Sequence, residues 1–164
     1  MQVFVSSQKK AASLALKNNP THIISISDPG VITPFDSGWA NSKVLSLKFF
    51  DVTNSAKAAQ MNPDEIPNKK FVEQIYNFGM DFDEDSIILI HCFAGISRSP
   101  AAGIISLTSR HGAFGATKIV GELNFAGEIG YKKFYPNDIM ISIFDDLLHF
   151  DGDLFDLVGE KFLV

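Results

Sequence analysis

Cysteine is almost absent from this sequence, which has a single one, Cys92, among its 164 residues. One cysteine excludes an internal disulfide and fits a reducing compartment. No apolar run approaches the length of a membrane span, and the N-terminal residues lack the apolar stretch of a secretory signal. We therefore expect a cytoplasmic protein with no membrane partner.

Positive charge is also scarce, because 14 lysines and arginines stand against 19 aspartates and glutamates, for a net charge of −5. Proteins that bind nucleic acid usually carry the opposite balance, so nucleic acid is not expected as a partner. The four histidines are scattered without metal-ligand spacing, and neither a metal nor another cofactor is indicated. A local positive loop on such an acidic chain can still bind a phosphorylated substrate.

Apolar residues make up 46% of the chain, which is enough for the core of a single domain spanning residues 1–164. The continuous apolar runs at 23–26 and 87–90 are typical of strands buried on both faces. Apolar periodicity and turn residues predict strands at 3–5, 22–26, 44–50 and 87–90, and helices at 8–18, 63–78, 100–110, 115–125, 137–149 and about 154–158. This order predicts an α/β fold, with a central, mostly parallel sheet flanked by helices.

The single cysteine opens a loop in the stretch His91-Cys92-Phe93-Ala94-Gly95-Ile96-Ser97-Arg98-Ser99, which follows the strand predicted at 87–90. A strand, a tight loop and a helix start supply backbone N–H groups and a helix dipole that favour an anion. The same groups favour the ionised thiolate of Cys92 over the thiol. Arg98, at the far end of the loop, can hold two phosphate oxygens with its planar guanidinium.

This stretch resembles the signature His-Cys-x5-Arg-Ser/Thr of the cysteine-dependent protein tyrosine phosphatases, most closely the small dual-specificity type in its bacterial branch. The resemblance implies that Cys92 is the nucleophile, that Arg98 binds phosphate, and that Ser99 helps the thiolate to leave. His91 would support the loop from behind, and Gly95 would adopt left-handed angles. Backbone N–H groups for the phosphate would come from Phe93, Ala94, Gly95, Ile96 and Ser97. Weaker similarity covers about residues 20 to 160 and includes Pro136-Asn137.

Cleavage of a phosphate ester also needs a general acid that protonates the leaving group. In the family this is an aspartate on a loop after an earlier strand, and Asp51, in Phe50-Asp51-Val52, matches it. Asp28, in Asp28-Pro29, is interpreted as turn chemistry. The remaining acidic run, Asp81 to Asp85, is interpreted as a solvated connector.

The resemblance implies metal-free hydrolysis of phosphate monoesters, above all protein phosphotyrosine, phosphoserine or phosphothreonine, through a phosphocysteine intermediate. One alternative is a catalytically inactive module that binds phosphorylated partners, although Cys92, Arg98 and Ser99 are all intact. Another is a phosphatase for a small-molecule or lipid phosphate, although the loop interior carries no lysine for additional phosphates. Lys132 and Lys133 could approach the site, but surface charges are the simpler interpretation. The oligomeric state is not predicted.

Overall fold

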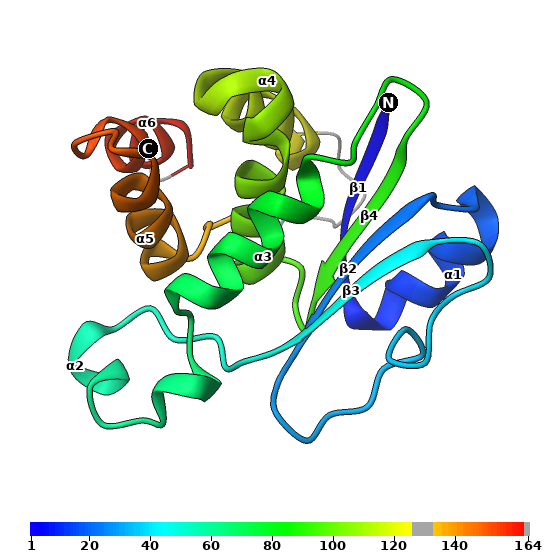
Figure 1. Cartoon of the computed structure of the whole chain (residues 1–164), viewed down its shortest axis with the longest axis horizontal. Coiled ribbons are helices and arrows are strands. Elements are labelled where there is room, and N and C mark those ends of the chain that lie inside the picture. Colours follow the sequence, from blue (N-terminus) through cyan, green and yellow to red (C-terminus); the bar gives the residue numbers. More distant parts are fainter. Residues whose placement is uncertain (126–132, 163–164) are drawn as a thin grey trace.

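The computed structural model describes residues 1–125 and 133–162 of the chain (Figure 1). Within these ranges, four strands form one fully parallel sheet with the spatial order β1-β4-β2-β3. The strands are β1 (Gln2–Ser7), β2 (His22–Ser27), β3 (Lys43–Lys48) and β4 (Ile87–Cys92). The predicted α/β architecture with a parallel central sheet is confirmed.

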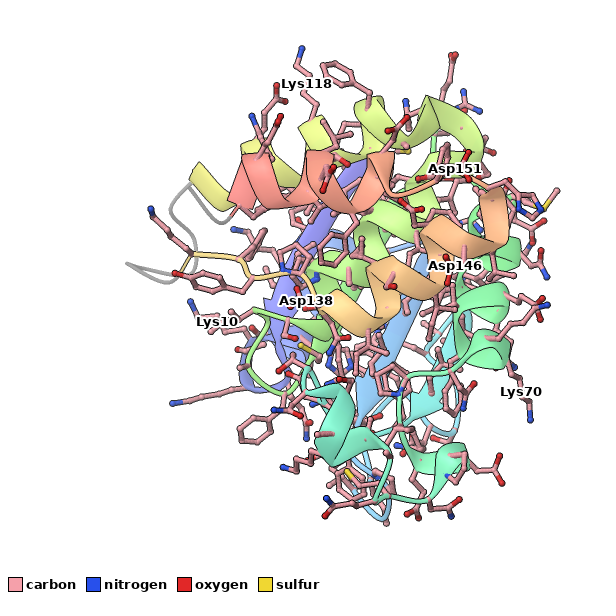
Figure 2. All side chains as sticks on the ribbon, turned by 90° about the vertical axis from the view of Figure 1, so that its left-hand side faces the viewer. Lys10, Lys70, Lys118, Asp138, Asp146 and Asp151 are labelled. Carbon is pink, nitrogen blue, oxygen red and sulfur yellow. The ribbon has the colours of Figure 1, made fainter. Side chains whose placement is uncertain are left out.

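Helices cover both faces of this sheet (Figure 1). On one face lies α1 (Gln8–Asn18), and the other face carries α3 (Lys69–Gly79), α4 (Arg98–Phe125), α5 (Asp138–Leu148) and α6 (Asp153–Phe162). Figure 2 shows the molecule from the side of α5 and α6. Asp138 and Asp146, labelled there, belong to α5, and Asp151 lies between the two helices. None of the helices described is long and apolar enough to cross a membrane.

The two central strands, β2 and β4, are apolar on both faces because each face packs against helices. Ile23 and Leu89 point into the smaller cluster beneath α1, whereas Ile24 and Ile90 belong to the main core with α3 and α4. Every residue of β2 is buried. This alternation explains why the sequence shows continuous apolar runs there rather than every second residue.

The prediction of one helix from Pro63 to Phe78 is wrong. Pro63–Glu65 forms a short 3₁₀ turn, η1, and α3 begins separately after the cap Asn68. Pro67 causes the break, because a residue before proline avoids helical angles and Ile66 is extended, with φ −124° and ψ 165°. The preceding loop, predicted without secondary structure, also contains the short helix α2 (Ser55–Ala58).

The two helices predicted at 100–110 and 115–125 are consecutive in α4, with a kink between them. Gly112 causes the kink, since its φ of 66° and ψ of 167° are not helical. The first part begins at Arg98, two residues earlier than predicted. The residues just before this start form the loop that connects Cys92 to Arg98.

Candidate active site

Cys92 lies at the junction between the central strand β4 and the helix α4. Cys92 is the last residue of β4 and Arg98 is the first of α4, so the connecting loop is only residues 93–97. Both side chains are buried, with 1% of Cys92 and 2% of Arg98 exposed. In parallel sheets the carboxyl ends of the strands meet at one edge, where ligands usually bind, and the loop lies at that edge.

Gly95 gives the loop its turn, as the sequence predicts. Its φ is 74°, in the left-handed region where glycine is unstrained, and its N–H donates to Sγ of Cys92 at 3.3 Å. A Cβ atom here would lie only 2.6 Å from backbone atoms of Ser6 and Ser7, at the end of β1. Both the turn and this close contact therefore require glycine.

Ser99 makes the second polar contact to the sulfur. Its Oγ lies 3.2 Å from Sγ of Cys92, and the serine is completely buried. The hydroxyl and the N–H of Gly95 together present two hydrogen-bond partners to one sulfur atom. Two donors at this sulfur would stabilise a negative charge on it.

The outer side of the loop is tied to the chain that precedes α5. The carbonyl oxygens of Ile96 and Ser97 accept hydrogen bonds from the backbone N–H groups of Tyr135 and Asn137, at 2.8 and 3.1 Å. Within a planar trans peptide the C=O and the following N–H point in opposite directions. The N–H groups of residues 97 and 98 are therefore directed away from residues 135–137.

Among the described residues, the guanidinium of Arg98 forms its hydrogen bonds through one nitrogen. Its Nη1 donates to Oδ1 of Asp28 at 2.7 Å and to the carbonyl oxygen of Phe49 at 2.6 Å. Its Nε is buried and has no hydrogen-bond partner among the described residues. This nitrogen is therefore a hydrogen-bond donor that a ligand could use. The edge formed by Nε and Nη2 can hold two oxygens of one phosphate group.

Asp28 has a role that the sequence analysis missed. It does begin a turn, since its carbonyl oxygen accepts from the N–H of Val31 at 3.1 Å. Its carboxylate also forms the ion pair that orients Arg98. The only signal for this contact is the strand order, because β2 lies beside β4 and both strands end at the same edge of the sheet.

Asp51 reaches the loop from the segment after β3. Its Oδ1 accepts from Oγ of Ser97 at 2.7 Å and from Nδ2 of Asn137 at 2.9 Å. Its Oδ2 lies 3.9 Å from Nε of Arg98, too far for a hydrogen bond. The aspartate chosen from the sequence therefore lies at the same edge as Cys92 and beside the free edge of the guanidinium.

The acidic run before β4 lies at the opposite edge of the sheet. Asp81 pairs with Lys43, the first residue of β3, at 3.0 Å, and both side chains are more than half exposed. Asp83 accepts from the hydroxyl of Ser86 at 2.8 Å, one residue before β4 begins. These carboxylates are a connector, as predicted, and are separated from Cys92 by the length of β4.

His91 is completely buried behind the loop. Its Nε2 lies 2.8 Å from Oγ of Ser25 on the neighbouring strand, and Ser25 in turn lies 3.3 Å from the hydroxyl of Thr33. Thr33 donates to Asp36, which pairs with Lys48 at 2.7 Å. Burial lowers the pKa of His91 from 6.5 to about 4, so the imidazole is neutral near pH 7.

This buried imidazole should make the protein less stable in mild acid. Below pH 6.5 the unfolded state binds a proton at His91, whereas the native state binds it only near pH 4. The free energy of unfolding should therefore fall by roughly 3 kcal/mol from this residue as the pH drops through that interval. Urea unfolding between pH 4 and 7 measures the fall, and the His91→Asn variant should show a shallower pH dependence.

His149→Asn is the matched control, because it makes the same substitution at an exposed histidine at the end of α5. Direct NMR titration of the wild-type imidazoles provides an independent reading. A His91 ring that becomes protonated near pH 6.5 would contradict the prediction.

A pocket of about 250 Å³ opens beside the loop. The residues that line it come from the ends of β2 and β3, from α2 and its neighbourhood, and from the loop after Cys92. They are Asp28, Phe50, Asp51, Val52, Lys57, Met61, Phe93, Ala94 and Arg98. Phe93 is 68% exposed at its rim. The pocket is thus lined by apolar side chains, two aspartates, Arg98 and one lysine from α2.

The described residues contain no group of three histidine, cysteine or acidic side chains that could hold a metal ion. Of the two lysines considered from the sequence, Lys133 is exposed and Lys132 lies outside the described residues.

Solved structures share this arrangement of sheet and helices. The structure of DUSP15 superimposes with a TM-score of 0.58, at 19% identity, over 98% of this chain and 92% of that one. This chain has the dual-specificity phosphatase fold. The same fold is found in human tyrosine phosphatase-like serine/threonine/tyrosine-interacting protein, with a TM-score of 0.53 and 21% identity over 91% of this chain and 92% of that chain.

PTPMT1 in complex with PI(5)P also has the dual-specificity phosphatase fold of this chain. It superimposes with a TM-score of 0.56 at 15% identity, over 92% of this chain and 94% of that one. Neither a protein-family model nor a curated protein matches the sequence. At these identities the likeness extends to the fold, and the chemistry must be argued from the residues of this chain.

Proposed function

We propose that this protein hydrolyses phosphate monoesters through a phosphocysteine intermediate on Cys92. The observation that carries the proposal is the unpaired, buried Nε of Arg98, at the end of a five-residue loop that begins at the hydrogen-bonded sulfur. A nucleophile and a vacant cationic donor on one loop match the needs of phosphoryl transfer, in which positioning and charge stabilisation dominate.

In the first step, the thiolate of Cys92 attacks phosphorus and forms an S–P bond while the bond to the leaving oxygen breaks. Asp51 gives its proton to that oxygen, and Arg98 stabilises the charge on the equatorial oxygens. In the second step, a water molecule attacks phosphorus and loses a proton to Asp51. The S–P bond breaks, inorganic phosphate forms, and the hydroxyl of Ser99 stabilises the departing thiolate.

The remaining loop residues support this chemistry through the backbone. The contact of Gly95 with the sulfur favours the role proposed for the N–H groups of Phe93, Ala94, Gly95, Ile96 and Ser97. His91, which is neutral and buried, would hold the end of β4 in place rather than exchange protons. The lone thiol fits a reducing compartment, and we propose the cytoplasm as its location.

Phosphorylated protein side chains are the proposed substrates, because Phe50, Val52 and Phe93 line the pocket beside Arg98 and could contact the side chain that carries the phosphate. Lys57 favours a second candidate, a small-molecule or lipid phosphate with an additional anionic group, since this exposed lysine lines the same pocket. The neighbour PTPMT1 was solved with such a ligand, PI(5)P. The alternative is an inactive module that binds phosphorylated partners, and detection of turnover would exclude it.

The direct test is hydrolysis of p-nitrophenyl phosphate near pH 6 in excess EDTA. We expect activity that survives the chelator, and a rapid-quench sample should contain protein heavier by one phosphoryl group at the peptide that holds Cys92. Failure to turn over this substrate with a reduced thiol would refute the enzyme proposal and favour the binding module. Activity lost with EDTA would contradict the cysteine mechanism.

A further inference from the structure

Asn137, the residue that caps α5, contacts both halves of the candidate site. Its side chain is completely buried, and its Oδ1 accepts from the N–H of Met140 at 3.0 Å, which is the helix cap. Its Nδ2 donates to Oδ1 of Asp51 at 2.9 Å and to the carbonyl oxygen of Val52 at 3.0 Å. Its backbone N–H donates to the carbonyl oxygen of Ser97.

The cap alone does not account for this arrangement. Capping uses only the side-chain oxygen, and serine or aspartate performs it as well as asparagine does. The amide nitrogen of Asn137 has both protons engaged, and both bonds go to the segment that carries Asp51. An amide is therefore needed at this position for the contact with that segment, not for the helix.

The hydrogen bonds at Asp51 also distinguish its two oxygens. Oδ1 receives two donors, the amide of Asn137 and the hydroxyl of Ser97, whereas Oδ2 accepts no hydrogen bond from the described residues and lies 3.9 Å from Nε of Arg98. An oxygen that already accepts two hydrogen bonds is a poor place for a proton. The transferable proton of the carboxyl group therefore belongs on Oδ2, the oxygen beside the free edge of the guanidinium.

We propose that Asn137 is a positioning residue, which holds Asp51 so that Oδ2 faces the phosphate group bound by Arg98. This inference rests on the proposed function, because it assigns Asn137 a role through the general acid. It makes the start of α5 part of the active site, although Asn137 itself touches neither the phosphate nor the sulfur. Loss of the amide should affect proton transfer to the leaving group and little else.

The test uses Asn137→Asp and Asn137→Ser, each of which keeps a capping oxygen and removes the amide. For O-phosphoserine, whose alkoxide leaving group needs a proton, kcat/KM should fall about 10- to 100-fold. For p-nitrophenyl phosphate, whose leaving group needs little protonation, kcat/KM should change less than about threefold. In the Asp51→Asn background, neither substitution at Asn137 should reduce O-phosphoserine turnover further.

Asn68→Asp is the matched control. Asn68 caps α3 through its Oδ1 and donates its Nδ2 to Pro63, so the same substitution removes an equivalent amide at a helix cap away from Asp51. It should leave the ratio of the two activities unchanged.

Equal losses for both substrates, or losses that add to those of Asp51→Asn, would overturn the positioning role while the phosphatase proposal stands. If the new carboxylate of Asn137→Asp prevents folding, Asn137→Ser still tests the positioning role, because serine introduces no charge. Absence of turnover in the wild type would refute the phosphatase proposal, and the positioning role would fall with it.

Discussion

Cys92→Ser should reduce hydrolysis of p-nitrophenyl phosphate by about 10⁴-fold or more, because a serine hydroxyl in the same place is not ionised and is a much weaker nucleophile. The change replaces one atom and leaves the arginine and the N–H groups of the loop intact. Binding of tungstate, a tetrahedral oxyanion, should therefore persist within a few-fold of wild type. Steady-state kinetics and isothermal titration calorimetry measure the two effects separately.

This separation of turnover from binding distinguishes nucleophile loss from a collapsed loop. If the serine variant lost both activity and tungstate binding, the sulfur would be holding the loop rather than attacking phosphorus. Residual activity within tenfold of wild type would require another nucleophile. The comparison needs excess EDTA so that traces of metal-dependent phosphatase do not contribute to the variant's rate.

Sequence alone predicted what lies close together along the chain. The bounds of α1 agree with the prediction, because its C-cap Asn19 adopts left-handed angles and Pro20 follows it. The cysteine loop was equally readable, since the nucleophile, the turning glycine and the arginine fall within seven residues. Such local patterns need no knowledge of which strands are neighbours.

Contacts between distant segments could not be read in this way, and Asp51 was placed near the loop only by its resemblance to the family. Asp51 and Asn137 are 86 residues apart, and Asp28 and Arg98 are 70 apart. Asp28 meets Arg98 because β2 and β4 are neighbours in the strand order β1-β4-β2-β3. Asn137 lies outside the sheet, on the segment before α5 that is hydrogen-bonded to Ser97. The sequence indicated a parallel sheet but not this order, so Asp28 could be interpreted only from its local Asp-Pro turn.

The ion pair of Asp28 explains why Arg98→Lys should be severe although it conserves charge. Arginine keeps Nη1 on Asp28 and Phe49 while a different edge of the guanidinium remains free for phosphate. Lysine has a single ammonium group, which cannot satisfy those acceptors and also grip two phosphate oxygens. We expect kcat/KM for p-nitrophenyl phosphate to fall about 10³-fold, and tungstate binding to weaken along with it.

Arg110→Lys is the matched control, because Arg110 is a partly exposed arginine outside the loop. Its Nη2 lies 3.4 Å from Oε1 of Glu84. It should change kcat/KM by less than about twofold. If tungstate binding weakens in Arg98→Lys but persists in Cys92→Ser, then Arg98 binds the oxyanion and Cys92 acts as the nucleophile. A loss below about tenfold in Arg98→Lys would instead mean that the unpaired Nε does not contact phosphate. Arginine and lysine carry the same charge, so only the forked geometry of the guanidinium distinguishes them here.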